Sequence, residues 1–204
     1  MKERGMIFNG EMVRAILEGR KAQTRRPFNW RRQPAMEMAE RDDGSLWPWA
    51  EDCERGGDIW FACPFGEVGD RVWVRETFRV HSRATDVATL VYRASVRNSW
   101  TEQTHRVPVA VCNKPATPEK WTPSIHMPRW ASRITLEITD VRVERLNSIT
   151  ESDAEAEGVT DTGFGDLLVD GFRYLWKSIY GDDSWQANPW VWVIEFKRVE
   201  GGAA

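Results

Sequence analysis

An alternation of apolar and polar residues over 132–146 is the feature that most limits the folds open to this chain. In SRITLEITDVRVERL every second side chain is apolar, which predicts a β-strand with one buried face. The alternation slips by one residue at Thr139-Asp140, so we expect either a bulge or two consecutive strands. Residues 190–199, WVWVIEFKRV, begin apolar on both faces and predict a central strand. The core is therefore expected to contain a β-sheet.

Two more strands and three helices are predicted around this sheet. Residues 71–80, RVWVRETFRV, alternate as a strand should, and residues 89–94 predict a short strand. The helices are expected at residues 9–19, 151–157 and about 166–180, and the residues expected to cap them are Asn9, Gly19, Thr150, Gly158 and Gly181. Between the first helix and Pro27, residues 24–26 should be extended. This order describes an α+β protein in which a curved sheet is plugged by a few helices.

The overall composition is typical of a soluble globular protein. The chain has 204 residues, of which 41% are hydrophobic and 29% are charged, and it is long enough for one substantial core. No run approaches the roughly 18 apolar residues of a membrane span. The N-terminal stretch MKERGMIFNG has no signal-peptide core. We therefore expect a cytoplasmic protein with no membrane partner.

The three cysteines predict no disulfide scaffold. Cys53, Cys63 and Cys112 form no C-x-x-C pair, and their spacing with His105 or His126 matches no structural zinc pattern. We expect buried or half-buried thiols and neither a metal nor a cofactor.

Basic and acidic residues gather in separate stretches. Residues 20–32 hold six basic residues and no acid, whereas residues 146–172 hold seven acids and no Lys or Arg, in a chain of net charge −3. The contrast favours a local anion site near the N-terminus over a polyelectrolyte groove. A solvated basic face remains the alternative.

Two stretches look like insertions. Residues 28–60 show no sustained period, and residues 97–130 are irregular and rich in proline. These stretches carry several of the twelve tryptophans, among them Trp47, Trp49, Trp121 and Trp130. Such side chains either stack on a nucleobase or anchor long loops onto the body.

Several motifs together resemble the ASCH-domain family. They are ILEGRKAQTRR, GDRVWVRETF, the S-x-T-x-x-D-A-E-A-E-G helix and the terminal VWVIEFKRV. The segment PSIHMPRWASRI is similar to a phage and prophage branch of that family. The resemblance implies a PUA-like curved β-barrel with a few packed helices and RNA-related functions. It implies one domain over residues 1–204, with insertions at about 28–60 and 82–130.

The resemblance also implies a reactive trio. A small bacterial member of the family is an amidohydrolase that converts N4-acetylcytidine to cytidine and acetate, and its motif falls here on Lys21, Thr24 and Glu157, with Glu155 as the competing glutamate. An amide bond needs a nucleophile, a proton acceptor and a donor to the leaving nitrogen. Thr24 would attack, a neutral Lys21 would accept its proton, and Glu157 would hold the lysine, orient a water or shuttle the proton. The implied reaction removes an acyl group from a modified cytosine nucleoside.

Other readings of these residues stay open. Substrate contacts are expected from Arg20, Arg25, Arg26 and Trp130, with Arg26 also placed to steady an oxyanion beside Thr24. The alternative function is a non-catalytic PUA-like module that binds RNA or modified nucleic acid. Lys21 and Glu157 also fit an ordinary salt bridge, and Thr24 an ordinary strand residue. Whether the partner is a free nucleoside or a nucleic acid, and the oligomeric state, do not follow from these residues.

Overall fold

The computed structural model describes residues 1–32, 35–95, 104–160 and 167–199. The chain divides into two compact units. The first unit comprises Met1–Gly19, Asp70–Glu137 and Arg198–Ala204, and the second comprises Arg20–Gly69 and Ile138–Lys197. The single domain predicted over residues 1–204 stays a prediction, because two compact units can belong to one domain or to two.

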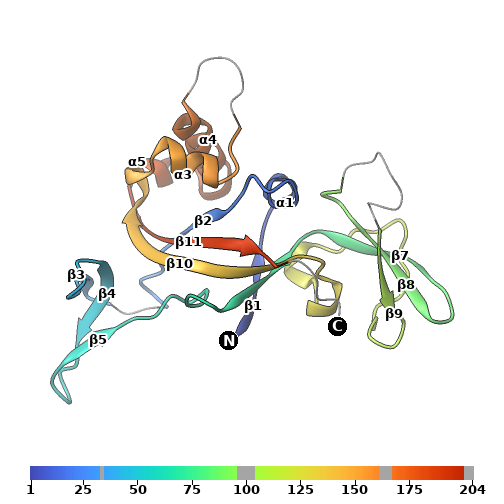
Figure 1. Ribbon diagram of the computed structural model, residues 1–204, viewed down its shortest axis with the longest axis horizontal. Coiled ribbons are helices and arrows are strands. Elements are labelled where there is room, and N and C mark those ends of the chain that lie inside the picture. The colour runs from blue at the N-terminus through green and yellow to red at the C-terminus, as the bar shows by residue number, and fades with distance from the viewer. Residues whose placement is uncertain (33–34, 96–103, 161–166, 200–204) are drawn as a thin grey trace. The chain divides into compact units, whose positions relative to one another are not determined.

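The first unit contains two separate groups of paired strands. Strand β1 runs parallel to β6, and Thr135–Glu137 of β10 pair antiparallel with β6. Strands β7, β8 and β9 form a separate antiparallel sheet and lie side by side (Figure 1). The elements with residues in this unit are β1 (Glu3–Ile7), α1 (Gly10–Leu17), β6 (Arg71–Arg75), β7 (Phe78–Arg83), β8 (Val87–Tyr92), β9 (Thr104–Pro108), the 3₁₀ turns η1 (Ser124–His126) and η2 (Arg129–Ala131), the start of β10 (Thr135–Arg145) and the last residue of β11 (Trp190–Arg198).

The prediction of one continuous strand over residues 71–80 is wrong. Strand β6 ends at Arg75 and β7 begins at Phe78, in a different sheet. At the break the Glu76 backbone N–H donates to Met127 Sδ at 3.2 Å, and the Thr77 carbonyl accepts from the Arg93 N–H at 2.9 Å. These bonds, to residues distant in sequence, satisfy the backbone groups at the break. Beyond the break, Phe78 lies in a buried cluster with Leu90, Tyr92 and Met127.

The second unit is built on β11, which pairs antiparallel with β2. Residues Val191 to Ile194 of β11 are all buried, so the predicted central strand is confirmed. Helices α3, α4 and α5 lie together in Figure 1, and α4 packs against both of the others. The elements with residues in this unit are β2 (Gln23–Pro27), β3 (Glu37–Glu40), β4 (Leu46–Glu51), β5 (Asp58–Trp60), the rest of β10, η3 (Leu146–Ser148), α3 (Glu151–Ala156), α4 (Leu168–Tyr180), α5 (Asp183–Gln186) and β11 (Trp190–Arg198).

Parts of the stretches predicted to be irregular are ordered. Within residues 28–60, β3, β4 and β5 form a three-stranded antiparallel sheet. Its central strand contains Pro48 between two tryptophans, so the polar alternation that marks a strand is weak there. Strand β9 likewise lies within residues 97–130, and the short strand predicted at 89–94 is confirmed as β8. The alternation around Thr139 breaks inside one strand, β10, and not between two.

The predicted helix caps are confirmed. The Asn9 side chain accepts from the Met12 N–H at 2.8 Å, and Thr150 forms a capping box with Asp153. Gly181 ends α4 with φ of 88°. The predicted helix start at Asp166 lies outside the described residues.

The predicted α+β class is confirmed, since sheets and a few helices make up the described residues. The strands that the structure describes form open sheets and no closed barrel. The curved PUA-like barrel is therefore not observed in that part of the chain.

Removal of the Thr150 hydroxyl should loosen α3, the helix that leads to Glu157. Thr150→Ala loses the hydrogen bond from the Asp153 N–H at 3.1 Å, and we expect the free energy of unfolding to fall by about 1 kcal/mol. Urea unfolding would measure this change. Thr160→Ala, at an exposed position outside a helix, is the control and should leave stability unchanged. Equal losses in the two variants would contradict the capping role.

Candidate functional site

The basic turn that begins at Arg20 is fastened to the end of α3. Gly19, with φ of 75°, lets the chain leave α1. Lys21 then forms an isolated antiparallel β-bridge with Glu157. The next residue, Ala22, donates its N–H to the Ala156 carbonyl at 2.8 Å. These bonds place the side chains of Lys21 and Glu157 opposite each other.

Lys21 and Glu157 form a buried ion pair. Lys21 Nζ donates to Glu157 Oε2 at 2.5 Å and to the Glu157 carbonyl at 2.8 Å. The two side chains are 0% and 1% exposed. Burial lowers the pKa of Lys21 because it penalises the ammonium; the Glu157 carboxylate opposes this shift, and Arg26 and Arg25 add to it. Burial therefore weakens the ammonium's hold on its proton.

The second carboxylate oxygen of Glu157 is under-satisfied. Within the described residues, Glu157 Oε1 is buried and accepts no hydrogen bond. The guanidinium of Arg25 approaches it, with Nη1 at 3.7 Å from Oε1. Buried acceptors are nearly always hydrogen-bonded, so this oxygen has capacity for one more donor.

Arg25 lies inside an acidic ring, which consists of the carboxylates of Glu144, Asp153 and Glu157. Its side chain is 0% exposed, and Nη2 lies 3.1 Å from Glu144 Oε2 and 3.2 Å from Asp153 Oδ2. Its guanidinium also donates to Gln23 and sits 6.0 Å from the centre of the Phe172 ring. In this arrangement Arg25 is turned towards its own protein and away from solvent.

Thr24 lies on the other face of β2. Side chains of a strand alternate between faces, so Gln23 and Arg25 share one face while Thr24 and Arg26 share the other. Thr24 is 1% exposed and pairs with Ile194 of β11. No hydrogen bond joins its hydroxyl to Lys21 or Glu157 in the part of the chain that the structure describes. The structure therefore brings together the lysine and the glutamate of the predicted trio and leaves the threonine apart.

The remaining predicted residues have other surroundings. Glu155 is exposed, so of the two candidate glutamates Glu157 is the one that contacts Lys21. Arg20 is exposed and donates to the Gly158 carbonyl at 2.7 Å, and Arg26 is half-buried. Trp130 belongs to the first unit, where it packs edge-on against Phe78 with ring centres 6.3 Å apart. Of the two roles expected for such tryptophans, this contact favours anchoring a loop over stacking on a nucleobase.

From the sequence we predicted no role for Arg142, a second arginine that binds these carboxylates. Arg142 on β10 contacts Glu144 at 2.6 Å, Glu195 at 2.5 Å and Asp153 at 3.4 Å. One signal could have indicated this cluster: Asp140, Arg142 and Glu144 recur at every second residue. Such spacing places all three on one face of a strand.

The described residues offer no metal site and no membrane span. No group of three or more His, Cys, Asp or Glu in that part of the chain is arranged to hold a metal ion. None of its helices has the length and apolar character needed to cross a bilayer. Cys63 and Cys112 are buried as expected, whereas Cys53 is exposed.

The comparisons with known proteins found one kind of similarity. No protein-family model matches the chain, and no curated protein matches it. The chain is similar to a high-resolution crystal structure of an ASCH domain from Lactobacillus crispatus JV V101. The two are 13% identical with a TM-score of 0.42, and the match covers 97% of this chain and 79% of that chain. A TM-score of this size does not establish a shared fold, so membership of the ASCH family stays a prediction.

Breaking the buried pair on one side should destabilise the protein strongly. Lys21→Met leaves Glu157 buried without its ammonium, and we expect a loss of about 3–5 kcal/mol in urea unfolding. Lys21→Met combined with Glu157→Gln should recover much of that loss, because neither of the two charges then remains buried. Lys177→Met, which removes a surface pair with Asp182 at 3.7 Å, is the control and should change stability by under about 1 kcal/mol. Additive effects of Lys21→Met and Glu157→Gln would contradict the coupling.

The lowered pKa of Lys21 should appear in the pH dependence of stability. Between that lowered pKa and the ordinary value of 10.5, the unfolded chain binds a proton that the folded chain has released. Stability from this residue therefore rises with pH across that window. Urea unfolding at a series of pH values should show a smaller rise for Lys21→Met than for the wild type. An unchanged slope would contradict the shift.

Proposed function

We propose that this protein is a hydrolase that removes an acyl group from a modified cytosine nucleoside of the N4-acetylcytidine kind, with Lys21 and Glu157 as its proton-transfer pair. The observation that carries the proposal is the buried contact of 2.5 Å between Lys21 Nζ and Glu157 Oε2, with Glu157 Oε1 lacking a hydrogen bond among the described residues. Strongly perturbed ionisable groups gather at functional sites.

The chemistry assigns one proton movement to each residue. A Lys21 amine that has lost its proton accepts one from the nucleophile as the nucleophile's oxygen bonds to the acyl carbon. The proton passes to the Glu157 carboxylate and from there to the N4 nitrogen as the carbon–nitrogen bond breaks. The products are the free cytosine nucleoside and the carboxylic acid. A direct contact between Nζ and Oε2 is the geometry that such a relay requires.

The nucleophile is either Thr24 or a water molecule, and the two differ in what they demand of the chain. Attack by Thr24 requires its hydroxyl to reach the face of β2 on which Gln23 and Arg25 lie. It frees the nucleoside and leaves the acyl group as an ester on Thr24, and a water molecule must then hydrolyse that ester to release the carboxylic acid and restore the hydroxyl. Attack by water requires only that Lys21 orient it. Because both side chains of the pair are shielded from solvent, either route requires displacement of the groups that cover them.

The alternative is a nucleic-acid-binding module whose expected contacts are Arg25, Arg26 and the loop aromatics. Of these, the Arg25 guanidinium is fully buried against the carboxylates of Glu144, Asp153 and Glu157. Phosphate-driven binding would also weaken steeply with salt, whereas nucleoside turnover would barely respond.

Turnover of N4-acetylcytidine tests the proposal. The wild-type protein should release cytidine and acetate, followed by mass spectrometry, and Glu157→Gln should lower kcat/KM by about 100-fold or more. Lys21→Arg is the sharper variant, because arginine can keep the ion pair but cannot give up a proton at neutral pH. It should fold as the wild type does and lose turnover.

Two further variants complete the design. Glu155→Gln, an exposed carboxylate two residues from Glu157, is the matched control and should turn over normally. Thr24→Val assigns the nucleophile, since full loss of turnover indicates Thr24 and retained turnover indicates water. A folded wild-type protein without turnover, or a Lys21→Arg variant with full turnover, would refute the hydrolase.

A further inference from the structure

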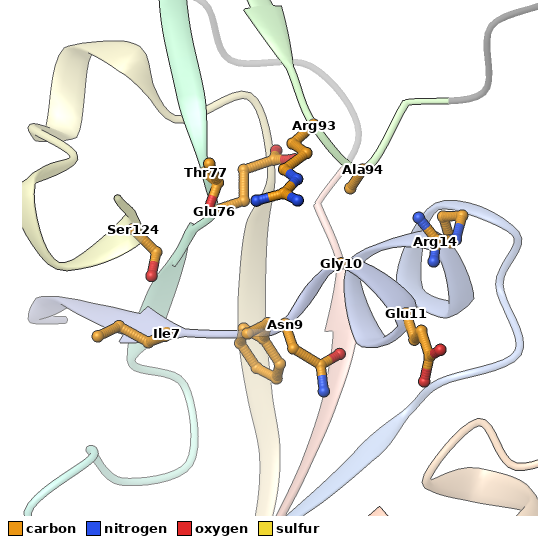
Figure 2. Close-up of a pocket in the computed structure, with 11 residues that line it drawn as sticks. Ile7, Asn9, Gly10, Glu11, Arg14, Glu76, Thr77, Arg93, Ala94 and Ser124 are labelled. Atoms are coloured by element: carbon orange, nitrogen blue, oxygen red, sulfur yellow. The ribbon is translucent and has the colours of Figure 1, made fainter. Parts of the chain in front are cut away.

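The first unit contains a cavity that the proposed hydrolase does not use. Its volume is about 560 Å³, which lies within the usual size of small-molecule sites. Figure 2 shows it around the end of β1 and the start of α1, below the residues that connect β6 to β7. Lys21, Thr24 and Glu157 belong to the second unit and do not line it, so this site stands independently of the hydrolase.

Two arginines from different elements line the cavity. Arg14 comes from α1 and Arg93 from the residues after β8, and Figure 2 shows their guanidinium groups on two sides of the space. Neither arginine has a carboxylate within ion-pair distance among the described residues. Arg14 Nη1 lies 3.6 Å from the position that a Cβ on Gly10 would take, so the guanidinium folds back over the start of the helix. Two such cations around one cavity favour an anionic ligand.

The buried acid in the wall does not oppose an anion. Glu76 is 2% exposed and makes a two-pronged contact with Arg133, at 2.8 Å to Nε and 3.0 Å to Nη2. Its charge is therefore matched within the wall, and burial raises the pKa of Glu76 against the opposing pull of Arg133. Glu11, the other carboxylate of the lining, is exposed.

The rest of the lining combines hydroxyl donors with apolar contacts. Thr77 and Ser124 contribute hydroxyl groups, and Ile7, Phe8 and Ala94 contribute apolar surface. A carboxylate offers two oxygens to donors, whereas a phosphate monoester offers three. Two guanidinium groups and two hydroxyls suit the larger number.

We propose that this cavity binds a small organic phosphate monoester. The phosphate lies between Arg14 and Arg93 and accepts from Thr77 and Ser124, and the organic group rests on Ile7, the exposed apolar side chain of the lining. The site has a binding role, and no bond is made or broken in it.

Calorimetric titration with three probes tests the ligand class. Phenyl phosphate should bind saturably and at least about tenfold more tightly than inorganic phosphate, which lacks the apolar group, or benzoate, which lacks the third oxygen. Benzoate binding as tightly as phenyl phosphate would overturn the assignment to a phosphate. Absence of saturable binding by phenyl phosphate would overturn the site.

Variants locate the binding in this cavity. Arg93→Ala and Arg14→Gln should each weaken phenyl phosphate binding about tenfold or more, and Thr77→Val by a few-fold. Arg106→Ala is the matched control, because Arg106 is an exposed arginine of β9 in the same unit and does not line the cavity. It should bind as the wild type does.

Melting temperatures of all the variants establish that they remain folded. A folded Arg93→Ala with wild-type affinity, or an Arg106→Ala with the same loss as Arg93→Ala, would overturn the proposal.

Discussion

A buried ion pair joins the turn that precedes β2 to the end of α3. Lys21 and Glu157 lie at the two chain positions where the turn meets the end of the helix, and their side chains are 0% and 1% exposed. Burying two charges costs several kcal/mol for each ion unless they are matched in close geometry. The contact of 2.5 Å and the second bond to the Glu157 carbonyl at 2.8 Å provide that match. The turn and the helix therefore hold their positions together, and a change to one charge acts on both.

The charged residues around this pair come from two oppositely charged stretches of the sequence. Arg25 comes from the basic stretch at residues 20–32, while Asp153 and Glu157 come from the acidic stretch at 146–172. In the folded second unit these stretches meet, so part of the expected anion site is occupied by the protein's own carboxylates. Arg31 and Arg32 remain exposed. The basic stretch is therefore divided between inward and outward side chains.

Local features of the fold could be predicted because they depend on neighbouring residues. The Asn9 and Thr150 caps and the glycine at Gly181 each follow from a few adjacent side chains and backbone angles. The break between β6 and β7 could not be predicted, because it depends on Met127 and Arg93, which are distant in sequence. The sheet of β3 to β5 was missed because its residues lack a strict alternation. In the candidate site, the pairing of Lys21 with Glu157 was expected from the family resemblance, and no periodicity in the sequence reports it.

The two units each bury an acid against a cation, and the identity of the cation decides what each pair can do. In the first unit the partner of Glu76 is Arg133, whose planar guanidinium binds the carboxylate in two-pronged geometry. Such a pair holds one wall of the cavity in place. In the second unit the partner of Glu157 is Lys21, a single ammonium whose pKa is lowered by burial. A lysine in that state can release and regain its proton, so only the second pair meets the requirement for proton transfer.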